Sequence, residues 1–253
     1  METKRLTRTE WLGYEDLGPM FPRVRGKATA RQLRLFACAC VRQVWHLLGD
    51  ERSRQAVEVA EKFADGRASQ DQVVSANRMA PGAYYWAFTP ALNGAAQAAT
   101  REAACAAYSC AHSFNADVSV IRVTANHASN ALGWVEASKV PPWELQGPRW
   151  RIGKANAIRE QCGLLRDIVN PFRLPSIDPG WLRWERGTVL RIARSLYDEG
   201  RFDELPILAD ALEDAGCEEQ LIAHCREPGP HVRGCWALDL LLEKGTKLSR
   251  VGA

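Results

Sequence analysis

The sequence has little that would place the protein in a membrane or direct it out of the cell. None of its apolar runs approaches the length of about 20 residues that a membrane-spanning helix needs. The first residues, Met1 to Arg5, lead into a polar segment with acidic residues instead of the apolar core of a signal peptide. We therefore expect a cytoplasmic protein with no membrane partner.

Catalytic signatures and a strong charge bias are also missing. The sequence has no nucleophile-elbow glycine pattern, no His-Glu-x-x-His motif and no phosphate-binding loop. Its formal net charge is +3 over 253 residues, well short of the excess that makes nucleic-acid binding the first expectation. These absences favour a noncatalytic protein. A cysteine–histidine nucleophile pair stays open, because such partners are neighbours in space and not in sequence.

Strand patterns are nearly absent, and helix patterns fill the chain. Residues 118–123 alternate and form the one passable strand candidate, but no second strand is available to pair with them, so we expect a helix there too. We predict an all-α protein, either a multi-helix bundle or an irregular helical array, with a C-terminal set of short antiparallel helices. The predicted helices begin near Thr29, Asp50, Ser69, Pro90, either Asn115 or Asp117, Lys154, Thr188, Asp203, Cys217 and Pro230.

Capping residues support several of these helices. Thr29 with Gln32, and Ser69 with Gln72, have the spacing of a capping box. Glycines stand where a helix C-terminal glycine is expected, at Gly66, Gly200, Gly216 and Gly245.

The segment from Asn170 to Gly180 contains three prolines and is the best candidate for an internal boundary. We predict an N-terminal helical region, residues 1–170, whose middle is rich in alanine. Residues 171–253 are predicted to form a short-helix bundle that packs on the first region as one unit.

Two sequence blocks carry a family resemblance. The first comprises LRLFACAC (33–40), WHLL (45–48), DERSR (50–54) and AVEVAE (56–61); the second comprises LPILADALEDAGC (205–217), HCR (224–226) and PGPHVRGCW (228–236). Together they resemble an uncharacterised helical protein family expanded in planctomycete bacteria. The resemblance implies a bacterial protein with helical ends around a variable middle rich in alanine and tryptophan. That family has no established activity, so the resemblance implies no mechanism.

The strongest group of chemically active residues lies near the C-terminus. The eight cysteines are read as thiols or metal ligands, because a cytoplasmic protein seldom carries a disulfide framework. Zinc takes four nitrogen or sulfur ligands in a tetrahedron, and a helix over 230–244 would place two such residues, four positions apart, on one face. A structural zinc site and simple core packing are both consistent with the candidate set, which is Cys217, His224, Cys225, His231 and Cys235.

Two basic stretches, residues 23–34 and 149–159, support a nucleic-acid alternative. Lysine and arginine neutralise phosphates, and an exposed tryptophan can stack on an unpaired base. The competing interpretation is that these residues are solvated helix ends and loops. The residues concerned are Arg23, Arg25, Lys27, Arg31, Arg34, Arg149, Trp150, Arg151 and Lys154.

Close-packed helices without active-site signatures lead to one functional prediction. We expect a noncatalytic helical protein–protein interaction module, or an accessory subunit of a larger assembly, whose partner is another protein. The alternative is a nucleic-acid-binding accessory protein that uses the two basic stretches and a structural zinc site.

Overall fold

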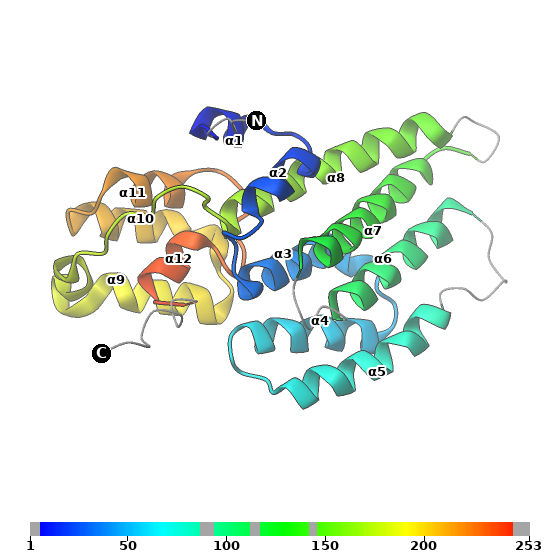
Figure 1. Ribbon diagram of the computed structural model, residues 1–253, viewed down its shortest axis with the longest axis horizontal. Coiled ribbons are helices and arrows are strands. Elements are labelled where there is room, and N and C mark those ends of the chain that lie inside the picture. The colour runs from blue at the N-terminus through cyan, green and yellow to red at the C-terminus, as the bar shows by residue number, and fades with distance from the viewer. Residues whose placement is uncertain (1–5, 87–93, 112–116, 142–145, 245–253) are drawn as a thin grey trace. The chain divides into compact units, whose positions relative to one another are not determined.

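The computed structural model describes residues 6–86, 94–111, 117–141 and 146–244 (Figure 1). These ranges contain helices and no strand, which confirms the all-α prediction. Among the described residues, none of the helices combines the length and the apolar character that crossing a bilayer requires. The chain divides into two compact units, Met1–Cys162 and Gly163–Ala253, and each is described separately below.

The first unit contains seven helices and most of an eighth within the described residues, together with one short 3₁₀ turn, η1 (Trp45–Leu47). The helices are α1 (Arg8–Gly13), α2 (Leu17–Val24), α3 (Ala30–Gln43), α4 (Glu51–Ala64), α5 (Gln70–Trp86), α6 (Ala95–Ala111), α7 (Val118–Ala137) and α8 (Gln146–Ile168). Helix α7 covers the segment considered as a strand, so the preference for a helix there is confirmed.

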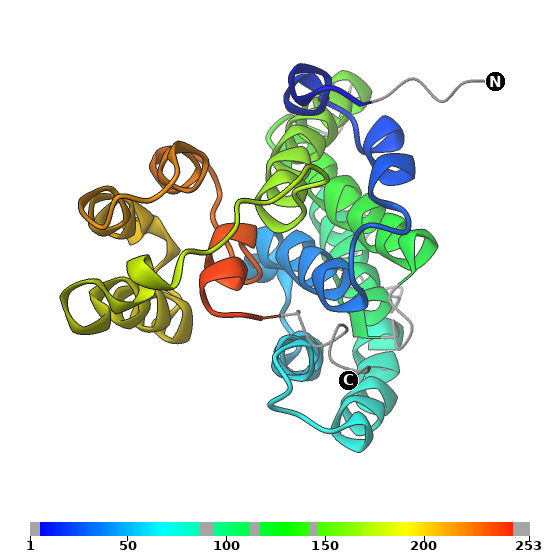
Figure 2. The ribbon, with the colours of Figure 1, turned by 60° about the vertical axis from the view of Figure 1, so that its left-hand side comes forward.

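Helix α3 is the centre of the first unit. Every residue from Leu33 to Val41 is buried, as its wide apolar stripe predicts. It packs against α4, α6 and α7, and α6 in turn lies along α7 (Figure 1, Figure 2). Because α6 buries mostly alanine side chains, its neighbours can approach closely without large gaps.

The predicted capping boxes are present at the starts of α3 and α5. The amide of Gln32 donates to Thr29 Oγ1 at 3.2 Å, and the Thr29 amide donates back to Gln32 Oε1 at 3.0 Å. Ser69 and Gln72 exchange the same pair of bonds, at 3.2 and 2.7 Å. Each box satisfies two amides that the first helical turn leaves without partners, which fixes where the helix begins.

The second unit contains the end of α8 and four further helices among the described residues. They are α9 (Pro179–Glu199), α10 (Leu205–Asp214), α11 (Glu219–Arg226) and α12 (Trp236–Leu241), with a 3₁₀ turn, η2 (Phe202–Glu204), before α10. Helix α9 is broken at residues 184–187, where Glu185 and Arg186 have positive φ angles of 43° and 59°. It ends at Gly200, whose φ of 73° gives the left-handed cap that glycine adopts without a steric penalty.

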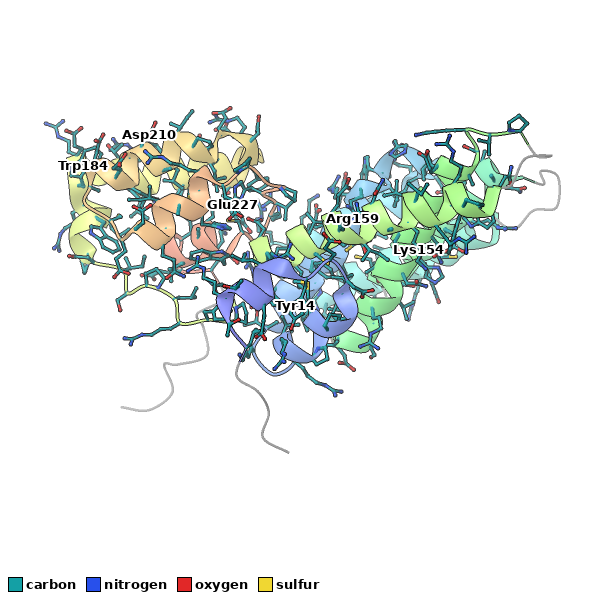
Figure 3. The ribbon with its side chains drawn as sticks, turned by 90° about the horizontal axis from the view of Figure 1, so that it is seen from above. Tyr14, Lys154, Arg159, Trp184, Asp210 and Glu227 are labelled. Carbon is teal, nitrogen blue, oxygen red and sulfur yellow. The ribbon has the colours of Figure 1, made fainter. Side chains whose placement is uncertain are left out.

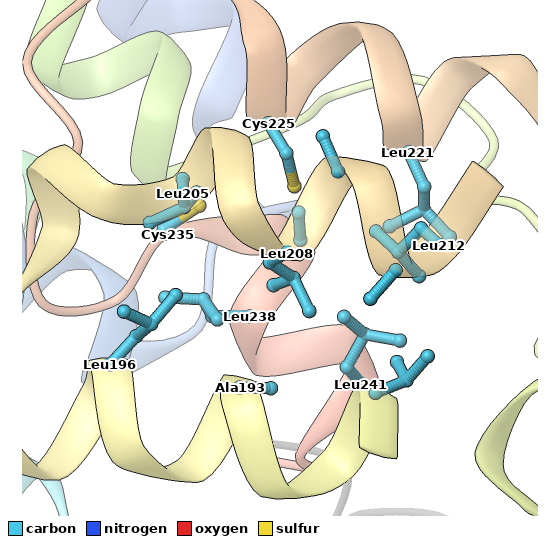
Figure 4. Packing of buried hydrophobic residues seen from close by; sticks show 14 of the residues in the cluster. Ala193, Leu196, Leu205, Leu208, Leu212, Leu221, Cys225, Cys235, Leu238 and Leu241 are labelled. Atoms are coloured by element: carbon cyan, nitrogen blue, oxygen red, sulfur yellow. The ribbon is translucent and has the colours of Figure 1, made fainter. Parts of the chain in front are cut away.

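Large aliphatic side chains from these helices form the core of the second unit. Leu205, Leu208 and Leu212 of α10 are fully buried and face Leu196 of α9 and Leu238 of α12 (Figure 4). Burying a leucine side chain contributes roughly 1.5–3 kcal/mol. The core therefore holds α9, α10 and α12 together, and α11 adds Leu221 and Cys225 to it.

The prediction of a helix over 230–244 is wrong. The chain from Glu227 to Cys235 has no regular structure, and the helix is only the six residues of α12. Pro228 and Pro230 cannot donate backbone hydrogen bonds, and Gly234 has a φ of 95°, so this segment cannot continue α11 as a helix.

Candidate metal centre

Four side chains of the second unit converge on one point. They are Asp167 near the end of α8, His224 in α11, His231 in the segment between α11 and α12, and Cys235 immediately before α12. Each offers one ligand atom, and the four atoms all lie within 4.8 Å of one another. Carboxylate, imidazole and thiolate are the groups that bind zinc in proteins.

The measured separations are close to those of a tetrahedral zinc site. Zinc bonds of 2.0–2.3 Å place neighbouring ligand atoms roughly 3.3–3.8 Å apart. His224 Nε2 lies 3.2 Å from both Cys235 Sγ and Asp167 Oδ1. His231 Nδ1 lies 2.7 Å from Asp167 Oδ1. Only small outward movements of these side chains are needed to admit an ion.

Backbone groups orient two of the four ligands. The Val232 amide donates to Asp167 Oδ2 at 2.9 Å, which leaves Oδ1 directed at the other side chains. His231 Nε2 lies 3.1 Å from the carbonyl oxygen of Glu227. Because a carbonyl only accepts, Nε2 must carry a hydrogen, and Nδ1 is the atom available to a metal. Histidine ligands in proteins are held in this way by a partner on the second ring nitrogen.

The group is almost completely shielded from water. The Asp167 side chain is 5% exposed, His231 is 8% exposed and His224 is 11% exposed. Cys235 is fully buried. The ring of Trp236 packs at 4.6 Å from the ring of His224 and closes one side of the group. A buried carboxylate requires a compensating positive charge, which either a metal ion or an imidazolium can supply.

The pKa shifts describe the metal-free state of the group. Burial raises the pKa of the Asp167 carboxyl group, but hydrogen bonds from His224 and His231 outweigh burial, so its pKa is below the ordinary value. Burial lowers the pKa of His231, but the hydrogen bond to Asp167 and its charge raise it above the ordinary value. Without a metal, the ionised Asp167 therefore favours the protonated form of His231.

Cys235 is a thiol in that state, because burial and the negative charge of Asp167 raise its pKa well above the ordinary value. A zinc ion would displace the proton of His231 and that of Cys235. The bound state would then contain one carboxylate, one thiolate and a divalent cation, with no net charge left in the buried site.

The geometry does not fit a catalytic triad. In a Cys–His–Asp triad the thiol and the carboxylate contact opposite nitrogens of the histidine ring, so that one orients the ring while the other gives up its proton. Here a single nitrogen, Nε2 of His224, faces both Cys235 and Asp167. Four ligand atoms directed at one point could instead hold a metal ion.

Three of the five sequence-predicted ligands belong to this group: His224, His231 and Cys235. The other two lie elsewhere in the second unit. Cys225 is buried in the leucine core (Figure 4). Cys217 is partly buried and packs against that core. Burial raises the pKa of each of these two thiols to about 12. Both surroundings are typical of cysteines that act as small apolar side chains.

Sequence reasoning missed Asp167, the fourth member of the group. It lies 64 positions before His231, so only the fold brings the two together. One signal was available. Asp167 follows Arg166 in the middle of a segment, residues 164–169, whose other four residues are apolar. Two of these, Leu165 and Ile168, are fully buried. An acidic residue among buried apolar residues requires a specific partner.

Most residues of the two basic stretches are engaged within the protein. Arg34 is buried, with its guanidinium over the ring of Phe63, and Arg31 pairs with Asp65 at 2.9 Å. Arg23 is half-buried, whereas Arg25 and Lys27 are exposed.

In the second stretch, Arg149 pairs with Glu136 at 3.4 Å, and Arg151 is exposed. Lys154, which lies on α8 together with Arg159 (Figure 3), donates to Asn126 Oδ1 at 3.1 Å and covers the ring of Trp150. Trp150 is half-buried and also packs on Gly133, so its ring contacts both Lys154 and Gly133 within the protein.

Comparison with protein-family models, with curated proteins and with solved structures gives no match to this chain. Functional inference therefore depends on the geometry of the group formed by Asp167, His224, His231 and Cys235.

Proposed function

We propose that this protein is a noncatalytic helical interaction module whose C-terminal unit is stabilised by a structural zinc ion. The observation that carries the proposal is the convergence of Asp167 Oδ1, His224 Nε2, His231 Nδ1 and Cys235 Sγ in a buried position. Four protein ligands complete a tetrahedral zinc shell, as structural sites require, and leave no position for a reacting water.

The donor set supports zinc over other common cations. Calcium and magnesium take oxygen ligands in larger shells, and this group offers one carboxylate oxygen. Two imidazoles and a thiolate suit zinc, which accepts a tetrahedral arrangement without an electronic preference of its own.

The zinc test measures metal content in the purified protein after dialysis against a weak chelator. We expect about one zinc per chain in the wild type, and loss of the metal in His231→Ala and Cys235→Ala. Cys217→Ala is the matched control, because this thiol lies outside the group, and it should keep the zinc. Wild-type protein without metal, or zinc lost equally from the control, would overturn the proposed site.

A cobalt-substituted sample reports the geometry and the ligand type of the bound metal, in addition to its amount. Tetrahedral cobalt with a thiolate ligand absorbs strongly in the visible and near-ultraviolet regions. We expect these bands in the wild type, and we expect Cys235→Ser to remove the thiolate charge-transfer band. Bands of octahedral cobalt in the wild type would show that the four side chains do not form the shell.

The interaction role is supported by apolar side chains that remain exposed on regular helices. Ile207 of α10 is 54% exposed, and Ile152 of α8 is 52% exposed. A single exposed apolar residue is ordinary on a protein surface, so each needs its own test.

We expect proteins captured by the wild type to be lost with Ile207→Lys or Ile152→Lys and retained with Asp198→Lys, an exposed control. Capture unchanged in both variants, or capture of nucleic acid instead of protein, would contradict a protein partner at these surfaces.

A further inference from the structure

A pair of buried thiols in the first unit can undergo a reaction that does not involve the candidate metal site. That site, formed by Asp167, His224, His231 and Cys235, is called the metal group below. Cys38 of α3 and Cys110 of α6 are each 1% exposed, and their sulfur atoms lie 3.5 Å apart. The two helices pack directly against each other. The thiols are 72 positions apart in the sequence, so their contact is a product of the fold.

The distance between these sulfurs is short enough for a disulfide bond. A disulfide has an S–S length of about 2.05 Å, so the sulfurs must approach by about 1.5 Å. Rotation of the two side chains on packed neighbouring helices can supply a movement of this size, because each sulfur already faces the other.

The surroundings keep the pair reduced under ordinary conditions. The hydrogen bond with Cys110 and burial raise the pKa of Cys38 well above the ordinary value, although the charge of Arg34 acts in the opposite direction. Thiolate is the reactive form, so the pair reacts slowly and only with an oxidant small enough to enter a packed interior. Hydrogen peroxide is small and uncharged, whereas charged disulfides such as oxidised glutathione are excluded by the helices.

We propose that Cys38 and Cys110 are an oxidisable dithiol that hydrogen peroxide converts into a disulfide joining α3 to α6. One sulfur, as its thiolate, attacks a peroxide oxygen; the O–O bond breaks, and a sulfenic acid and one water form. The second sulfur then attacks the sulfenic sulfur, the S–O bond breaks and a second water leaves. The two thiols lose two electrons and the peroxide gains them.

The bond would tie together the two central helices of the first unit. Helix α3 contacts α4, α6 and α7, and α6 contacts α4, α5 and α7. A link between α3 and α6 would therefore also restrain the helices packed against them, α4, α5 and α7. A cross-link over 72 positions also restricts the unfolded chain, so the oxidised protein should be more resistant to heat than the reduced protein. Peroxide would thus change stability without involving the metal group.

The test treats the folded, full-length protein with hydrogen peroxide and digests it without reduction. We expect a cross-linked peptide containing Cys38 and Cys110, an intact mass lower by two hydrogen atoms, and reversal of both by dithiothreitol. Cys38→Ala should remove the cross-link. Cys105→Ala, which changes another buried thiol of α6, should keep it.

The wild-type peptide alone decides the question if a variant fails to fold. A cross-link that appears only in denatured protein, or sulfinic and sulfonic acids at Cys38 without any cross-link, would overturn the proposal. So would a cross-link that joins Cys38 to Cys105 as often as to Cys110. Zinc content has no bearing on this result, because the metal ligands lie in the other unit.

Discussion

At the scale of single residues, Asp167 is the member of the metal group whose two carboxylate oxygens both have defined contacts. Its Oδ1 atom faces both histidines and its Oδ2 atom accepts the Val232 amide. We expect Asp167→Asn to weaken zinc binding on the order of 100-fold or more, because an amide is a poor zinc ligand and fixes the histidines less firmly. Competition with a chelator of known affinity measures the change.

Asp198→Asn is the control for that measurement, since Asp198 is an exposed acidic residue of the same unit. Unaltered zinc affinity in Asp167→Asn would mean that the three remaining side chains hold the ion with water, and the site would then have the open position of a catalytic centre.

Three residues of the metal group could be predicted from the sequence. The helix that was expected to bring two of them together, over residues 230–244, is not formed as predicted. His231 and Cys235 were expected on one face of a helix, but His231 lies in an irregular segment and Cys235 caps α12. Residue type and nearness in sequence were sufficient to find them. The fourth member, Asp167, lies in α8, 64 positions before His231. It could not be predicted, because a contact between distant segments produces no recognisable spacing in a single sequence.

Glu102 provides a residue-scale test of pH dependence in the first unit. It contacts His127 Nδ1 at 2.8 Å and accepts from Asn130 at 3.3 Å. Burial raises its pKa, but the hydrogen bonds to these two residues outweigh burial and lower the pKa below the ordinary value. A lowered carboxyl pKa stabilises the fold above the unfolded-state value of about 4.3, and this stabilisation is lost as pH falls through the folded-state value.

We therefore expect Glu102→Gln to unfold at lower urea concentration than the wild type at pH near 7. The difference should disappear as the pH falls through the lowered folded-state pKa of Glu102, because the wild-type carboxylate is then itself protonated. A gap between the two urea midpoints that is constant over this range would show that the charge of Glu102 contributes nothing.

At the scale of helices, close approach of α7 and α8 depends on glycine. A Cβ atom at Gly153 would lie 2.6 Å from the Cβ of Glu136 and 2.8 Å from the carbonyl oxygen of Leu132. These atoms belong to the backbone or its first side-chain carbon, so they cannot move aside without displacing the helix. Gly153→Ala should destabilise the protein by about 1–3 kcal/mol through overpacking.

The matched control is Gly147→Ala in the same helix, where a Cβ would meet no atom within 4 Å. We expect this change to be neutral or to stabilise by up to about 1 kcal/mol, because alanine restricts the unfolded chain. Urea unfolding of both variants measures the difference. Equal effects from the two substitutions would mean that α7 and α8 are not in close contact at Gly153.

Helix existence could be predicted more fully than helix ends. Caps at Thr29 and Ser69 and the stop at Gly200 follow from local chemistry, and all three are present. The predicted helix start near Thr188 agrees with the break in α9 at residues 184–187, but the part of α9 before the break and the short length of α12 could not be foreseen in the same way. In both places the chain adopts an irregular path, and the residues around it are held by packing in the second unit.

At the scale of the whole molecule, the four side chains of the candidate metal group all lie in the second unit, and three of them lie between residues 224 and 235. This segment includes the irregular connection from α11 to α12, which has few backbone hydrogen bonds of its own. Zinc would fix it at three points and join it to Asp167. Removing the metal should therefore loosen this connection, while the helices of the first unit keep their packing.

Limited trypsin digestion with and without a strong chelator tests this expectation. The chelator should expose the bond after Arg226, at the start of the irregular connection, and the bond after Arg233, within it, while cleavage in residues 6–86 stays unchanged. Adding zinc should restore protection in the wild type but not in Asp167→Asn, because that variant lacks the ligand from α8. Equal cleavage with and without metal would show that the hydrogen bonds that Asp167 accepts from His231 and Val232 suffice to order the segment. The four side chains would then be a buried ion-pair network, and the C-terminal unit would be held by its leucine core alone.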